Sequence, residues 1–108
     1  MNKNKIYTNV NTAAEATRKT AESFSFSIEA LKADNRQRAC ADMRSMLMHA
    51  LRNETALSLN EIGFILNRDH SCVMYNIRKV DNLVNNDIAF ANRYKTIAKN
   101  LVNNFTNE

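Results

Sequence analysis

The chain has 108 residues, with 15 Lys and Arg against 11 Asp and Glu and a formal charge of +4. It contains one Gly, no Pro and no Trp, and 44% of its residues are hydrophobic. This length and composition predict a single globular domain, and the shortage of turn residues disfavours a sheet. One Gly cannot build a glycine-rich phosphate loop, so the sequence predicts no bound nucleotide.

Membrane insertion, secretion, metal binding and catalysis lack support in the sequence. No apolar run approaches the roughly 18 residues of a membrane span, and the basic N-terminus leads into no apolar signal core. Cys40 and Cys72 have no CxxC pairing, so we expect two reduced thiols in a cytoplasmic protein. Together with His49 and His70 they lack the spacing of a metal site. We expect no cofactor, and no nucleophile pattern predicts an enzyme.

Helical periodicity runs through most of the chain. Apolar residues recur at three- and four-residue steps, which predicts helices over residues 12–24, 28–33, 39–55, 59–66, 70–85 and 88–105. We expect residues 1–10 to form a flexible N-terminal tail and residues 11–106 to form one helical domain. Ser27 is the predicted cap of the second helix, and the polar residues 34–38 are a predicted loop. The predicted fold class is all-α, a compact bundle of about five to six helices.

Residues 58–85 have the arrangement of a helix-turn-helix, in which a short helix and a longer one flank a tight turn. Ser58 and Glu61 have the S-x-x-E spacing of a capping box. Gly63 lies inside the short helix, where it costs about 1 kcal/mol relative to Ala, so we expect two helices to approach closely there. Polar residues gather where the longer helix begins, and in this motif that end meets base edges in the major groove.

Three segments carry a family resemblance at matching spacing. They are Leu59-Asn60-Glu61-Ile62-Gly63, Asn67-Arg68-Asp69-His70-Ser71-Cys72-Val73 and Ile77-Arg78-Lys79-Val80. They resemble the C-terminal DNA-binding domain of the bacterial replication initiator DnaA, and the likeness covers about residues 12–102. It implies a bundle like that of the DnaA C-terminal domain or Trp repressor. It also implies binding of double-stranded DNA at a DnaA-box-like site, regulating replication initiation or transcription. Only about ten residues precede the first predicted helix, so we expect a free-standing domain without the initiator's ATPase module.

The chain departs from the family's motif at several positions. Asn60 replaces the family's Pro, and Asn67 stands where a Gly pair is usual, in a turn that is one residue shorter. Cys72 replaces the second hydroxyl, and Asn76 occupies the position of a small residue. Because Cys72 and Asn76 are expected on or beside the reading surface, the preferred DNA sequence can differ from the family's usual box.

The resemblance assigns base contacts to residues around the turn. His70 offers a donor and an acceptor near neutral pH. Asp69 is either a helix N-cap alone or also an acceptor for the amino group of cytosine. Ser71 suits a base or a phosphate, and Cys72 suits a thymine methyl or the core. Arg36 is placed in a minor groove narrowed by A·T-rich sequence. The candidate base contacts are Arg36, Asn60, Arg68, Asp69, His70, Ser71 and Cys72.

Phosphate contacts are expected from the basic central part of the chain. Residues 32–79 contain 8 Lys and Arg against 5 Asp and Glu, which leaves most of the positive charge in the proposed binding half. Phosphate neutralisation of this kind fixes a protein's position on the duplex without reading sequence. The candidate phosphate contacts are Lys32, Arg38, Arg44, Arg52, Tyr75 and Lys79.

The last predicted helix leaves a second function open. Its apolar residues Phe90, Tyr94, Ile97, Leu101 and Phe105 recur near a spacing of 3.5 to 4. They can form a seam with a partner chain, such as a replication or transcription protein, or they can pack on their own bundle. The alternative to DNA binding is therefore a protein-interaction module that keeps the helical scaffold. Such a module has no need for the polar cluster at the start of the preceding helix.

Overall fold

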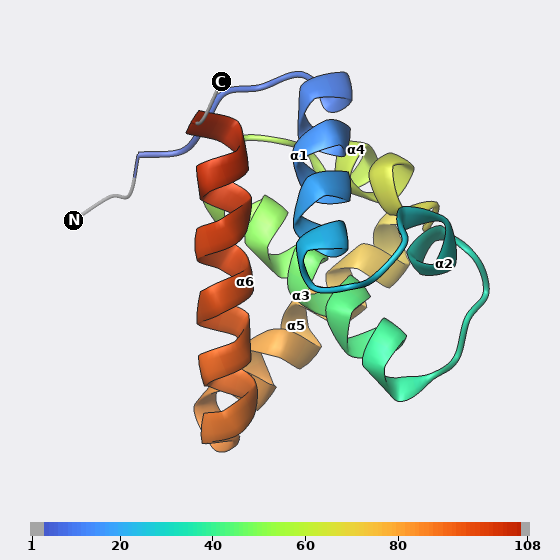
Figure 1. Cartoon of the computed structure of the whole chain (residues 1–108), viewed down its shortest axis with the longest axis vertical. Helices are drawn as coiled ribbons and strands as arrows, with labels where there is room; N and C mark the ends of the chain where they lie inside the picture. The colour runs from blue at the N-terminus through green and yellow to red at the C-terminus, as the bar shows by residue number, and fades with distance from the viewer. Residues whose placement is uncertain (1–3, 107–108) are drawn as a thin grey trace.

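The computed structural model describes residues 4–106, which form six α-helices and no strand (Figure 1). In chain order the helices are α1 (Val10–Ser23), α2 (Ile28–Lys32), α3 (Arg38–Glu54), α4 (Leu59–Leu66), α5 (His70–Asn86) and α6 (Ile88–Thr106). The predicted all-α fold is confirmed, and each predicted helix ends within two residues of the observed one. Within the described range, no helix combines the length and the hydropathy that a membrane crossing requires.

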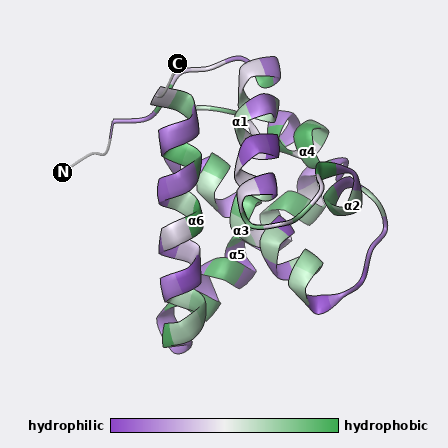
Figure 2. Ribbon diagram, in the orientation of Figure 1, coloured by the Kyte–Doolittle hydropathy of each residue, from purple (hydrophilic) through white to green (hydrophobic). Residues whose placement is uncertain are grey.

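The helix α3 is the centre of the bundle, because it packs against α2, α4, α5 and α6 (Figure 1). The helices α1 and α6 lie next to each other, and α1 also packs against α2 and α4. The core is completely buried at Leu47 and Leu51 on α3, Leu66 on α4, Val73 on α5 and Leu101 on α6. Figure 2 shows the hydrophobic residues on the inward helix faces and a hydrophilic loop joining α2 to α3.

Side-chain caps define where the short helices begin. The hydroxyl of Ser27 accepts the N–H of Ala30 at 3.1 Å, as predicted for the start of α2. At α4 the Ser58 hydroxyl accepts the N–H of Glu61 at 3.1 Å, and the Glu61 carboxylate accepts the N–H of Ser58 at 2.8 Å. The predicted capping box is therefore confirmed, and it fixes the first helix of the helix-turn-helix.

The segment before α1 is tied to the bundle. The N–H of Ile6 donates to the carbonyl of Glu54 at 2.8 Å, and the N–H of Ala56 donates back to the carbonyl of Ile6 at 3.0 Å. These bonds pair the segment with the link between α3 and α4 in a short parallel bridge. The prediction of a flexible tail over residues 1–10 is wrong for this segment, and residues 1–3 lie outside the described range.

The apolar stripe of α6 faces the interior of the bundle. Phe90, Ile97 and Leu101 are at most 5% exposed, and Tyr94 and Phe105 pack against the same core. Of the two interpretations of this stripe, packing on the protein's own bundle is the one observed. A partner chain cannot reach these side chains without opening the contacts of α6 with α1, α3 and α5.

One polar cluster joins three helices. The two ring nitrogens of His49 on α3 lie 2.6 Å from the hydroxyl of Tyr94 on α6 and 2.6 Å from the carboxylate of Asp81 on α5. The rings of His49 and Tyr94 meet edge to face with centroids 4.9 Å apart. Burial, with a smaller contribution from Glu54 and Asp81, raises the pKa of Tyr94 above its ordinary value. The cluster therefore holds α6 against the α3–α5 pair.

Candidate nucleic-acid interface

The turn between α4 and α5 is closed by backbone geometry. Asn67 adopts the left-handed conformation with φ 58° and ψ 49°, which Asn tolerates better than most residues. The N–H of Arg68 then donates to the carbonyl of Gly63 at 2.8 Å. A Cβ atom at Gly63 would overlap the carbonyl oxygen of Arg68, and it would touch Val73 only at an ordinary 3.5 Å. The tightest approach at Gly63 is thus with the turn backbone, and Val73 of α5 lies in ordinary contact beside it.

The first turn of α5 presents exposed polar side chains. Asp69 is the N-cap, and one oxygen of its carboxylate accepts the N–H of Cys72 at 2.8 Å. The side chain of Asp69 stays exposed, so its second oxygen faces solvent. His70 and Ser71 are also exposed. The structure therefore brings three of the predicted base contacts together at the helix end that this motif inserts into the major groove.

Two neighbouring positions turn toward α3. Cys72 is half-buried, and the amide nitrogen of Asn76 donates to its carbonyl at 2.8 Å. The amide oxygen of Asn76 accepts the hydroxyl of Ser45 on α3 at 2.5 Å. The amide of Asn76 is therefore engaged within the protein, because its oxygen is bonded to α3 and its nitrogen to the backbone of α5.

Arg68, predicted as a base contact, donates hydrogen bonds to backbone carbonyls of the protein itself. Its guanidinium donates to the carbonyl of Lys32 at 3.0 Å and to that of Ala33 at 2.8 Å, and also to the carbonyls of Leu66 and Asn67. These are the last residue of α2, the residue after it, and two residues next to Arg68 itself. The side chain therefore points to the end of α2 and the start of the α2–α3 loop.

Arg44, predicted as a phosphate contact, is buried at 8% exposure. Its guanidinium donates to the carbonyl of Leu31 at 2.8 Å and to that of Asn35 at 3.0 Å. Burial first, and then the nearby positive charge of Arg68, lowers the pKa of Arg44 from its ordinary value. The prediction for Arg44 is wrong, because a side chain enclosed by α3 and the loop cannot reach DNA without unfolding that contact.

The loop between α2 and α3, residues 33–37, accepts hydrogen bonds from both of these arginines. Arg68 thereby connects it to the turn. Arg36 is its most prominent charge, with 88% of the side chain exposed and a loose 3.8 Å contact with the equally exposed Asp34. The amide oxygen of Asn35 accepts the N–H of Gln37 at 3.0 Å, which shapes the loop before α3 begins. Arg36 is thus an exposed cation on the loop whose first residue, Ala33, accepts from Arg68 of the turn.

The remaining candidates are distributed over the surface. Lys32, Arg38, Arg52 and Asn60 are exposed, and Lys79 is half-buried. Arg52 lies at the opposite end of α3 from the loop and donates to the carbonyl of Leu57 at 3.4 Å. The structure therefore gathers Lys32 and the turn residues on one side and leaves Arg52 apart from them.

One exposed cation was missed by the sequence analysis. Arg78 on α5 is exposed, and among the residues that the structure describes no acidic side chain pairs with it. It lies one helical turn from Tyr75, whose ring is 68% exposed, and two turns from Ser71 on the same face. This seven-residue spacing from Ser71 was available in the sequence and could have identified Arg78 as a candidate for a phosphate contact.

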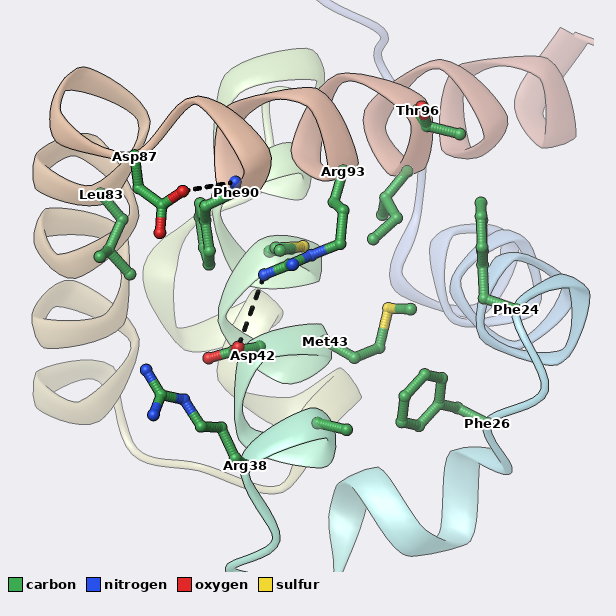
Figure 3. Close-up of a pocket in the computed structure, with 13 residues that line it drawn as sticks. Phe24, Phe26, Arg38, Asp42, Met43, Leu83, Asp87, Phe90, Arg93 and Thr96 are labelled. Carbon is green, nitrogen blue, oxygen red and sulfur yellow. Dashed lines mark hydrogen bonds and ion pairs between the residues drawn. The ribbon is translucent and has the colours of Figure 1, made fainter.

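A groove opens between α3, the end of α5 and α6, with a volume of about 820 Å³ (Figure 3). Its lining is largely apolar, with Phe26, Met43 and Phe90 among its side chains. Arg38 lies at its edge, and Arg93 approaches Asp42 to 3.8 Å across it. Among the residues that the structure describes, no cluster of side chains in this groove or elsewhere has the composition of a metal site.

A short capped helix, a left-handed turn and a longer helix with an exposed polar first turn define a helix-turn-helix domain. Sequence comparison then gives the family. Residues 14–80 match the family described as the bacterial DnaA protein helix-turn-helix, and the match covers more than half of the chain. The chain therefore belongs to the family of bacterial DnaA helix-turn-helix domains, a family of DNA-binding domains.

Two relatives show the extent of this similarity. The chain is 35% identical over 82 residues to the chromosomal replication initiator protein DnaA of Lachnoclostridium phytofermentans, covering 75% of this chain and 18% of that protein. It is 40% identical over 68 residues to the chromosomal replication initiator protein DnaA of Chloroflexus aurantiacus, covering 62% of this chain and 14% of the relative. The chain thus spans less than a fifth of the length of these relatives.

Proposed function

We propose that this protein binds double-stranded DNA sequence-specifically at a site similar to a DnaA box, with the first turn of α5 in the major groove. The observation that carries the proposal is the exposed group Asp69, His70 and Ser71 at the start of the second helix of the motif. A carboxylate on a DNA-facing surface opposes non-specific binding to phosphate. Its presence there supports a role in selecting sequence.

The α2–α3 loop supplies the second contact in this proposal. Arg36 is highly exposed on that loop, and the loop is bonded to the turn through Arg68. An extended Arg suits the minor groove that flanks the major-groove segment. Surface side chains would then fix the register on phosphates. The proposed set is the cations Lys32, Arg38, Arg52, Arg78 and Lys79 and the hydroxyl of Tyr75, with Asn60 as a further contact from α4.

The proposed biological role is regulation of replication initiation or of transcription by occupying such sites, without catalysis and without a bound nucleotide or other cofactor. Duplex DNA is the proposed partner and the cytoplasm, at the nucleoid, the proposed location. Docking of replication or transcription proteins through the apolar stripe of α6 is not part of this proposal, because that stripe is internal.

Fluorescence anisotropy tests the proposal with a duplex that carries a DnaA-type box and a scrambled duplex of equal length at about 150 mM salt. We expect a preference for the box of at least about a hundredfold, since specific binding exceeds non-specific binding by that much or more. His70→Ala should reduce this preference by roughly 1–3 kcal/mol. Arg78→Ala should weaken binding to both duplexes alike.

Weak and equal binding to both duplexes would leave two explanations that an unbiased selection of DNA sites separates. Enrichment of one sequence would mean that the departures at Asn67 and Cys72 have changed the preferred site. No enrichment would contradict sequence-specific binding and favour a protein-interaction role for the scaffold.

A further inference from the structure

Two arginines from different parts of the chain bond to the same short stretch of backbone. Arg44 on α3 reaches the carbonyls of Leu31 and Asn35 at 2.8 and 3.0 Å. Arg68, in the turn before α5, reaches the carbonyls of Lys32 and Ala33 at 3.0 and 2.8 Å. The end of α2 and the loop that follows are thus held from the bundle on one side and from the helix-turn-helix on the other.

This arrangement satisfies backbone carbonyls that α2 leaves open. The last carbonyls of a helix have no partner within it, and they attract cations. Here a second guanidinium is placed near the first, although burial and mutual repulsion oppose it, as the lowered pKa of Arg44 reflects. Asn67 adds a further bond, from its amide nitrogen to the carbonyl of Lys32 at 3.3 Å.

Arg44 and Arg68 lie next to the two surfaces proposed to contact DNA. Arg68 immediately precedes Asp69, the N-cap of α5. Asn35, whose carbonyl Arg44 holds, immediately precedes Arg36. One end of the bonded network therefore adjoins the major-groove segment, and the other end adjoins the minor-groove segment.

We propose that Arg44 and Arg68 are positioning residues that hold the α2–α3 loop at a fixed distance from the first turn of α5. Through them, the loop and the helix read one continuous DNA site. The proposal rests on the proposed DNA-binding function for its effect on sequence preference. The holding of the loop itself is independent of DNA and can be measured on the free protein.

The first measurement is ¹⁵N relaxation of the loop amides in the free, full-length protein, for wild type, Arg44→Lys and Arg68→Lys. Lysine retains the charge, but its compact ammonium lacks the fork that spans two carbonyls. We expect the loop to be as ordered as the helices in wild type and to gain fast motion in both variants, with helix order unchanged. If the loop stayed as ordered in both variants as in wild type, the proposal that these arginines hold it would be wrong.

The second measurement compares duplexes that share the core site and carry either A·T or G·C pairs in the flanking minor-groove segment. Wild type should prefer the A·T flank by at least about fivefold, the lower end of what one base-pair position contributes. Arg44→Lys should reduce this preference to about twofold or less. Its preference for the core site over a scrambled one should persist, and so should the slope of affinity against salt concentration.

Two control variants separate positioning from direct contact. Arg36→Ala should also lose the flank preference, and the double variant Arg36→Ala/Arg44→Lys should lose no more, because Arg44 acts through the loop that carries Arg36. Arg78→Ala should lower affinity for all duplexes and reduce the salt slope by about one charge. If Arg44→Lys behaved like Arg78→Ala, Arg44 would be a phosphate contact and the positioning role would be wrong.

The outcomes also separate this inference from the proposed function. Wild-type protein without any preference for the core site would contradict the proposed function, and the relaxation data would still decide whether the arginines hold the loop. A wild-type site preference with an unchanged flank preference in Arg44→Lys and Arg68→Lys would overturn the positioning role alone. Circular dichroism of each variant confirms that it is folded before either comparison is made.

Discussion

Gly63 and Arg68 are bonded and in contact across the turn of the helix-turn-helix. The N–H of Arg68 donates to the carbonyl of Gly63 at 2.8 Å. The carbonyl of Arg68 lies over the Cα of Gly63, where any side chain would overlap it. The chain's single Gly therefore stands where α4 must approach the backbone of the turn, and this approach sets the direction in which α5 begins.

Gly63→Ala is expected to destabilise the protein, although Ala favours helix by about 1 kcal/mol over Gly. The added methyl meets backbone, which cannot rotate away as a side chain can, and overpacking of this kind costs roughly 1–3 kcal/mol. Urea denaturation followed by circular dichroism measures the change. Asn60→Ala, on the exposed face of the same helix, is the control and should stay within about 0.5 kcal/mol of wild type. An equal or higher stability of Gly63→Ala would contradict the contact.

Asn67 offers a test of the left-handed turn. At its φ of 58°, a residue other than Gly or Asn is disfavoured by about 1–2 kcal/mol. We expect Asn67→Ala to be less stable than Asn67→Gly by about 1 kcal/mol or more in thermal unfolding. Both variants lose the amide bond to Lys32, so the difference between them isolates the backbone conformation. If the two variants had equal stability, the left-handed conformation would not be required.

Asp69 has two separable roles. Its carboxylate caps α5, so Asp69→Ala should lower the free energy of unfolding by about 0.5–2 kcal/mol. Asp69→Asn retains a cap of similar strength and should stay near wild type in the same denaturation measurement. These two variants therefore separate the cap from the charge.

The same pair tests whether Asp69 reads a base. Asp69→Asn removes the charge without removing the cap, so binding to scrambled DNA should tighten as phosphate repulsion falls. The preference for the cognate site should fall by roughly 1–3 kcal/mol if the carboxylate accepts from a base. An undiminished site preference in titrations of Asp69→Asn would assign Asp69 to capping alone.

Tyr94 should make stability depend on pH in the alkaline range. Burial raises its pKa above the ordinary value of about 10, so the unfolded chain releases this proton at a lower pH than the folded protein does. The stabilisation is fully present below about pH 10 and is lost as the pH rises through the folded-state pKa. Tyr94→Phe lacks this titration.

Denaturation of wild type and Tyr94→Phe across this range checks the expectation. Near neutral pH the variant should be less stable by about 1 kcal/mol, because it lacks the hydrogen bond with His49. The difference should shrink as the pH rises above about 10. A constant difference at all pH values would show that the phenol does not titrate differently in the folded and unfolded protein.

The helices and their caps could be predicted from the sequence because their signals are local. A helix repeats an apolar residue every three or four positions, and a capping box joins residues three apart, such as Ser58 and Glu61. Spacing alone therefore identifies both. The exposed first turn of α5 was predictable for the same reason, as was the family to which the chain belongs.

The directions of the long polar side chains were decided by the tertiary structure. Arginine is a residue type typical of DNA contacts, yet Arg44 and Arg68 both donate to carbonyls 9 to 36 positions away in the chain. Asn76 likewise finds its partner 31 positions away on α3. No local spacing predicts these long-range hydrogen bonds, because they depend on how α2, α3 and α5 pack together. Local spacing along the chain specifies which helices form and which residue types stand at the start of α5. The packing of α2, α3 and α5 specifies which cations remain exposed and which hold the protein's own backbone.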